Sequence, residues 1–204
     1  MSTTRPYRMA ARQEAVQATR ARILAAVRDL AYEQLDFDPT LERVASRAGV
    51  SVQTVLRHFV SRQALLEQAR ETARSEIVEE RRPAAGGADA ALRALLQHYE
   101  LRGAFTLAML AREDDDPGVA LITSAGKVVH RRWVAEVFAD ALPPEGASRD
   151  ALLDLLVVAT DVYAWKLLRR DRRLPVAAVH ARMRAMTDAL LAGSRAPSRK
   201  KDGS

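Results

Sequence analysis

Four polar side chains that can donate or accept hydrogen bonds lie within six residues of one another, namely Gln53, Thr54, Arg57 and His58. They are interleaved with apolar residues at helical spacing, so a short helix with its apolar side buried would turn them outward. A helix that presents such side chains in its N-terminal half fits the major groove of B-form DNA.

Helix-start and helix-stop signals place this stretch in a pair of short helices. Thr40, or Asp38 with a proline after it, can cap the first helix. Gly49 ends that helix, because the turn needs a residue that tolerates positive φ. Ser51 can cap the second helix. The stretch from residue 40 to residue 59 is therefore predicted to be a helix-turn-helix.

The apolar residues of this stretch predict how the two helices pack. Ala45 and Ala48 are small enough to let the helices cross closely, and Val50 would fill the crossing. Val55 and Phe59 would anchor the second helix to a longer one before the motif. That longer helix is predicted from about Arg20 to Leu35 by apolar residues at Ile23, Leu24, Val27, Leu30 and Ala31.

Helical patterns separated by breakers continue along the chain, and no segment alternates convincingly at period two. Ser61 opens a helix to about Glu80, and the proline- and glycine-containing stretch 82–87 interrupts it. Further helices are predicted over residues 88–99, 103–112, 117–142, 149–170 and 175–192. We therefore predict an all-α fold with essentially no sheet.

The stretch Ile23–Leu66, with LERVASRAGVSVQTVLRHFVSRQALL at its centre, resembles the DNA-binding domain of the TetR family of bacterial repressors. The string Thr160–Asp171 also resembles a common ending in that family. The resemblance implies a transcriptional regulator, expected to be a repressor. It would bind a palindromic operator as a dimer and be released by a small-molecule effector.

The same resemblance implies a set of DNA contacts. Gln53 would face the groove, where a glutamine can pair with an adenine edge, and Val52 would touch a thymine methyl group. His58 falls where the family contacts phosphate, although a packed histidine is the alternative. Leu56 departs from the family pattern, which often has a DNA-contacting tyrosine there. The implied DNA-binding residues are Thr40, Arg43, Ser51, Val52, Gln53, Thr54, Arg57, His58 and Arg62.

Two C-terminal helices carry extensive apolar surface. One has apolar residues at alternating spacings of three and four, and the helix before it is apolar nearly all round. The first interpretation is a buried core helix. The second, implied by the resemblance, is a four-helix bundle made by two protomers. The predicted interface residues are Leu156, Val176, Val179, Met183, Met186 and Leu190.

The resemblance also implies an effector domain over about residues 88–168, although nothing in the sequence names the ligand. The candidate ligand-binding residues are His98, Tyr99, Phe105, Met109, Arg112, Trp133 and Tyr163. The alternative for the aromatic residues is that they simply fill the core.

Several classes of function are disfavoured by composition and spacing. The chain has no cysteine, which excludes disulfides, thiolate catalysis and cysteine-based zinc sites. The histidines show no HExxH-like spacing, and no phosphate-binding glycine loop, nucleophile elbow or carboxylate pair stands out. We therefore expect no enzymatic activity, no metal site and no cofactor.

The net charge and the hydropathy of the chain indicate what it could bind and where in the cell it is expected. The net charge is +6, with ten arginines against six acidic residues in residues 1–62 and a further excess of three in residues 195–204. A basic balance fits a polyanionic partner. No apolar stretch approaches the ~20 residues that cross a bilayer, and the first twenty residues lack a signal-type apolar region. A cytoplasmic protein without a membrane partner is expected, associated with a bacterial nucleoid.

The predicted organisation is a basic flexible arm (1–17), a three-helix helix-turn-helix DNA-binding domain (18–66), a helical ligand-binding and dimerisation domain (67–193) and a basic disordered tail (194–204). The expected partners are double-stranded DNA, a second copy of the chain and a small-molecule effector. The alternative function is a small-molecule carrier or protein-interaction module with a vestigial helix-turn-helix.

Overall fold

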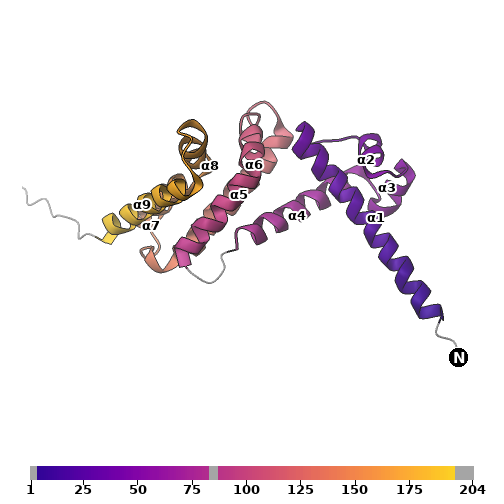
Figure 1. The fold of residues 1–204 in the computed structure, drawn as a ribbon, viewed down its shortest axis with the longest axis horizontal. Helices are drawn as coiled ribbons and strands as arrows, with labels where there is room; N and C mark the ends of the chain where they lie inside the picture. Colours follow the sequence, from indigo (N-terminus) through magenta and orange to yellow (C-terminus); the bar gives the residue numbers. More distant parts are fainter. Residues whose placement is uncertain (1–3, 83–86, 196–204) are drawn as a thin grey trace, which may run out of the picture. The chain divides into compact units, whose positions relative to one another are not determined.

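The computed structural model describes residues 4–82 and 87–195, and every regular element within these two ranges is a helix (Figure 1). The all-α fold class expected from the sequence is therefore confirmed. The chain divides into two compact units, unit 1 ending at Val78 and unit 2 beginning at Glu79. No helix in the described ranges is both long and apolar enough to cross a membrane.

Unit 1 contains a long helix followed by the predicted pair of short helices and most of a fourth helix (indigo to purple in Figure 1). Their bounds are α1 Thr4–Gln34, α2 Leu41–Ala48, α3 Val52–Phe59 and α4 Arg62–Glu80. Helix α4 runs through the boundary between the units, so the last residues of α4 belong to unit 2.

The core of unit 1 joins all four helices. It is formed by Ile23, Ala26, Val27 and Leu30 of α1, Val44, Ala45 and Ala48 of α2, Val55 and Phe59 of α3, and Leu65 and Leu66 of α4. The apolar positions predicted from helical spacing are thus the ones that the structure buries, with Leu24 and Val50 partly buried beside them. Burial of a side chain such as Phe59 contributes about 1.5–3 kcal/mol, so each short helix is held by its few inward residues.

The segment predicted as a basic flexible arm (1–17) is helical in the structure from Thr4, where α1 begins. Residues 9–18 are exposed, which explains why they lack an apolar period although they are helical. Alanine, glutamine and glutamate predominate after Arg12, and these residues favour helix without any packing. The predicted tail beyond Arg195 lies outside the described residues.

Unit 2 contains the end of α4 and the remaining helices. Their bounds are α5 Gly87–Leu110, α6 Pro117–Val137, η1 Ala139–Ala141 (a 3₁₀ turn), α7 Ala147–Thr160, α8 Val162–Trp165, η2 Lys166–Asp171 (a π-helical segment) and α9 Val176–Arg195. Helix α5 packs on α6, α8 and α9, and α7 packs on α6 and α9.

Two helix boundaries predicted for unit 2 are wrong. The helices expected over residues 88–99 and 103–112 are one continuous α5, in which Gly103 faces the ring of Trp165. A Cβ at Gly103 would lie 2.5 Å from Trp165 Cζ3, so this glycine allows close packing and does not break the helix. The helix expected over residues 149–170 is interrupted at Asp161, whose carboxylate accepts the Tyr163 N–H at 2.8 Å and so begins α8.

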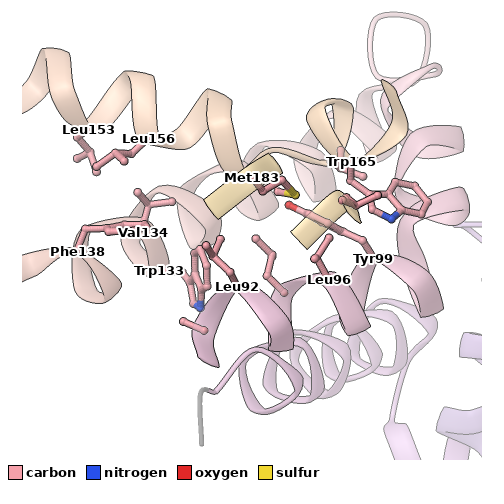
Figure 2. Close-up of a cluster of buried hydrophobic side chains, with 14 of the residues drawn as sticks. Leu92, Leu96, Tyr99, Trp133, Val134, Phe138, Leu153, Leu156, Trp165 and Met183 are labelled. Carbon is pink, nitrogen blue, oxygen red and sulfur yellow. The ribbon is translucent and has the colours of Figure 1, made fainter. Parts of the chain in front are cut away.

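Large apolar and aromatic side chains fill the middle of unit 2 (Figure 2). Met183 of α9 and Trp165 of α8 meet Tyr99 and Leu96 of α5 in this core. The Tyr99 hydroxyl is buried and donates to the Thr160 carbonyl at 2.9 Å, which ties α5 to the end of α7.

This core corrects half of the predicted dimer interface. Leu156, Val179 and Met183 are fully buried within the chain's own core, because α7 and α9 pack on each other, α7 also packs on α6, and α9 also packs on α5. Leu190 is partly buried against the same core. The other two predicted residues, Val176 and Met186, remain exposed. The apolar residues spaced alternately three and four apart therefore include some that pack within the protomer and others that remain exposed.

The turn after α3 is strained. Val60 has φ +61° and ψ −43°, and the Ser61 N–H donates across it to the Phe59 carbonyl at 2.5 Å. This is the positive-φ form of the γ-turn, which is rare and strained, and a β-branched residue tolerates it poorly. The Val60 side chain is 87 % exposed, so it contributes little packing.

Replacement of Val60 by glycine is expected to stabilise the protein by about 1 kcal/mol. The substitution would relieve about 1–3 kcal/mol of backbone strain in the folded protein. Glycine also raises the conformational entropy of the unfolded chain, which destabilises the folded protein by roughly 0.5–1 kcal/mol. Thermal unfolding followed by circular dichroism should show a Tm that is higher by about 2–4 °C. Val60→Ala is the control, because alanine keeps most of the strain. A lower Tm for the glycine variant than for the alanine variant would contradict this account.

Candidate nucleic-acid interface

Two side-chain caps and one left-handed glycine shape the α2–turn–α3 motif. Thr40 Oγ1 accepts the Arg43 N–H at 3.4 Å and begins α2. Gly49 has φ +65° and ψ +40°, and its N–H closes the last turn of α2. Ser51 Oγ accepts the Thr54 N–H at 3.1 Å and begins α3. The residues predicted as caps from the sequence thus have these roles in the structure.

Helix α3 divides into a buried face and an exposed face. Val55 and Phe59 point into the core of unit 1, with 0 % and 3 % of their surface exposed. Gln53 and Arg57 are exposed, and Thr54 is half-buried beside Ser51, with the two hydroxyl oxygens 3.0 Å apart. Of the remaining predicted contact residues on α3, Val52 and His58 are half-buried. The polar residues of α3 therefore have the outward disposition that groove binding requires.

Two of the predicted DNA-contacting arginines are held by partners within unit 1. The Arg43 guanidinium pairs with Asp36 at 2.6 Å and also donates to the Gln34 side chain. Arg62 Nε donates to the Pro39 carbonyl at 2.9 Å, and Arg62 Nη2 pairs with Asp38 at 2.6 Å. These bonds fix the loop before α2, so both arginines have a structural role whether or not they also reach DNA.

Arg57 differs from these two arginines. Its side chain is exposed, and the described residues offer it no hydrogen-bond or ion-pair partner. A guanidinium without an internal partner keeps its five N–H donors available for a phosphate or a base edge. Leu56, where the resemblance leads one to expect a tyrosine, is 38 % exposed next to it.

Arg20 of α1 is a positioning residue that the sequence analysis missed. Its Nη1 donates to the His58 carbonyl at 2.5 Å, its Nη2 donates to the Gln68 side chain, and its guanidinium carbon lies 4.2 Å from the centroid of the Phe59 ring. One side chain thus connects α1 to the C-terminal end of α3 and to α4. The position of Arg20 in the sequence could have indicated this role. Arg20 lies three residues before Ile23, and residues three apart share a face of a helix, here the buried face of α1.

The predicted ligand-binding residues are only partly brought together. His98, Tyr99 and Trp133 are buried in unit 2, with the His98 and Tyr99 rings 5.8 Å apart. Phe105 and Met109 are half-buried further along α5. Arg112 and Tyr163 are exposed. No group of three or more metal-ligating side chains suited to hold an ion occurs among the described residues.

Substitution of Arg20 by methionine is expected to lower the free energy of unfolding by about 2 kcal/mol. Hydrogen bonds made by a charged group contribute roughly 1.5–3 kcal/mol, and methionine preserves most of the packing volume. Arg20→Lys should recover part of the loss, because lysine keeps the charge over Phe59 but cannot span both acceptors. Thermal unfolding would measure both, with exposed Arg22→Met as the control. Equal stability of the Arg20 and Arg22 variants would refute the positioning role.

Comparison with known proteins bears on this motif. The family model described as "Bacterial regulatory proteins, tetR family" matches residues 23–69, which contain α2, the turn and α3. A search of curated proteins found no match. Among solved structures, the chain is similar to a transcriptional regulator from Rhodococcus sp. Rha1. The two are 21 % identical with a TM-score of 0.61, and the match covers 87 % of this chain and 99 % of that one.

The structural likeness establishes that the fold, beyond the helix-turn-helix alone, is one that a transcriptional regulator uses. The family match falls on the segment whose residues suggested the resemblance, and that segment forms the predicted motif. Residues 23–69 of this chain therefore match the helix-turn-helix segment of the tetR family of bacterial regulatory proteins, and the fold as a whole is similar to that of a solved transcriptional regulator.

Proposed function

We propose that this chain is a transcriptional regulator of the TetR family, a repressor that binds a palindromic operator as a homodimer and leaves it when a small-molecule effector binds. The observation that carries the proposal is the exposed polar face of α3, which Val55 and Phe59 hold in place from below. Gln53 and Arg57 would read base edges or phosphate, and operator binding would place the protein on the bacterial nucleoid.

A second copy is needed for tight and specific binding, because one eight-residue helix makes few contacts. Two recognition helices about 34–36 Å apart, or a multiple of that spacing, read half-sites on one face of the duplex. The apolar surface for such pairing lies on α7 and α9, which pack against each other. Leu155 and Val158 of α7 are 51 % and 67 % exposed, and Val176 and Met186 of α9 are also exposed.

This exposed set replaces the buried half of the interface expected from the sequence. Leu155 and Val158 are one helical turn apart and share a face of α7. Exposed apolar residues gathered on two adjoining helices are typical of a protein–protein contact. We therefore assign dimerisation to Leu155, Val158, Val176 and Met186.

We place the effector site in unit 2, where polar groups lie within an apolar core. His98, Tyr99 and Trp133 lie among the core residues, and each makes a hydrogen bond within the protein that a ligand could exchange for one of its own. Ligand pockets combine apolar walls with a few polar groups of this kind. Release from DNA would follow if the effector binds one conformation of the protein better than the other.

Operator binding can be tested on the DNA immediately upstream of the gene. Fluorescence anisotropy at about 150 mM salt should show binding that is at least roughly 1,000-fold tighter than to a scrambled duplex. Gln53→Ala and Arg57→Ala should each weaken operator binding by about tenfold or more, since a good base contact contributes about 1–3 kcal/mol. Equal affinity for both duplexes would exclude sequence-specific regulation by this motif at that site.

Arg74→Ala is the matched control, because it removes the same charge from an exposed, ion-paired position of α4. Its effect should be small for both duplexes. The alternative function, a carrier or interaction module with a vestigial helix-turn-helix, predicts instead that the Gln53 and Arg57 variants bind DNA no differently from the Arg74 variant.

Dimerisation can be tested with the double variant Leu155→Glu and Val158→Glu. Two carboxylates on this face would have to be buried without partners in the dimer, so the variant should sediment as a monomer with unchanged helicity. Leu101→Glu is the control, because Leu101 is an exposed leucine of the same unit on α5. A double variant that remains dimeric while the Leu101 variant dissociates would move the interface to another face.

A further inference from the structure

Arg81 is the residue that follows α4, and its guanidinium is buried inside unit 2. Only 9 % of its surface is exposed. Its carbonyl accepts the Trp133 indole N–H at 3.2 Å, and its guanidinium carbon lies 5.9 Å from the centroid of the Tyr99 ring. Arg81 is therefore fixed between α5 and α6, on the side of the core where the predicted ligand-binding residues meet.

The charge of Arg81 has no counterion of its own among the described residues. Nη2 lies 3.0 Å from His98 Nε2, Nε is buried without any hydrogen-bond partner in the described structure, and no ion pair to a described carboxylate is formed. Glu80 and Asp161 act on Arg81 only at longer range. Asp161 is engaged at the start of α8, where it accepts the Tyr163 N–H.

Glu80 is already committed to other partners. Arg102 Nε donates to both of its carboxylate oxygens, at 3.0 and 2.8 Å, and Arg102 Nη2 donates to it as well. The His98 Nδ1–H donates to Glu80 Oε2 at 2.8 Å, which leaves His98 Nε2 as the acceptor for Arg81.

Among Arg81, Arg102, Glu80 and His98, two guanidinium groups therefore stand against one carboxylate, and the carboxylate of Asp161 attracts Arg81 only at longer range. Burial, with the nearby Arg81 charge, lowers the pKa of His98 to about 3, so the imidazole is neutral at physiological pH. Arg102 alone pairs with the carboxylate of Glu80, and the guanidinium of Arg81 has no ion pair within the part of the chain that the structure describes. An uncompensated buried charge is strongly unfavourable, and proteins pair such charges or use them to bind an ion of opposite sign.

We propose that Arg81 binds the carboxylate of an organic acid with an apolar body, and that this acid is the effector. The inference rests on the proposed function. A guanidinium matches a carboxylate through two parallel hydrogen bonds, and Arg81 retains Nε for one of them. A carboxylate supplies the one ion-pair partner that Arg81 lacks in the described ranges, whereas a phosphate dianion brings two negative charges to a single unpaired guanidinium. The Tyr99 and Trp133 side chains around Arg81 belong to the apolar core, which suits an apolar body.

The first experiment needs no knowledge of the acid and compares two buried arginines of one cluster by thermal unfolding. Arg102 is 8 % exposed and paired with Glu80, so Arg102→Met should lower the Tm by several degrees. Arg81→Met removes an uncompensated charge, so its Tm should equal or exceed that of the unchanged protein. If the Arg81 variant falls as far as the Arg102 variant, Arg81 is a structural residue and the proposal is overturned.

The second experiment uses benzoate and octanoate as probes, with benzamide and octanamide as uncharged controls. At least one acid should raise the Tm by about 3 °C or more at roughly ten times its Kd. The amides should not, and Arg81→Met should abolish the shift. Stabilisation by the amides, a shift that persists in the Arg81 variant, or no shift with either acid up to about 10 mM would each overturn the proposal.

Operator binding provides the separate readout for the proposed function. The Arg81→Met protein should bind the upstream DNA as the unchanged protein does, but a stabilising acid should no longer release it. If the acid stabilises through Arg81 and no sequence-specific DNA binding is found, the ligand site stands and the repressor function fails. If DNA binding is specific but the acid stabilises both proteins equally, only the assignment of Arg81 fails.

Discussion

The recognition surface depends on the burial of two side chains beneath a helix of only eight residues. A helix of this length is not stable alone in water, so α3 exists because Val55 and Phe59 are buried in unit 1. Arg20 adds a polar restraint at the opposite end from the Ser51 cap, since it donates to the His58 carbonyl and covers the Phe59 ring. Every outward side chain of α3 takes its direction from these contacts.

Local signals explain which parts of the fold could be predicted from the sequence. Thr40, Ser51 and the left-handed Gly49 each form their capping hydrogen bonds with residues no more than four positions away. Their roles could therefore be predicted from the sequence. Gly103 shows the limit, because its close contact with Trp165 joins residues 62 positions apart and no local pattern reveals it. The partners of Arg20, the His58 carbonyl and the Gln68 side chain, are also distant in sequence, so its internal bonds could not be foreseen.

The same limit applies to the C-terminal helices. An apolar period shows that a helix must be covered, but it does not distinguish cover by the same chain from cover by a second copy. Leu156 and Met183 are covered within the chain, whereas Leu155 and Val158, on the same helix as Leu156, are not. A helix that is apolar nearly all round can therefore serve the core with one face and association with the other.

The contrast between Arg81 and Arg102 links stability to regulation. If stability alone were selected, a buried arginine would be paired with a carboxylate, as Arg102 is paired with Glu80. A buried cation without that partner makes the unliganded state less favourable and increases the free energy gained when an anion arrives. A ligand shifts a conformational equilibrium only by its difference in affinity between two states. Arg81 directly follows α4, whose Leu65 and Leu66 belong to the core of unit 1.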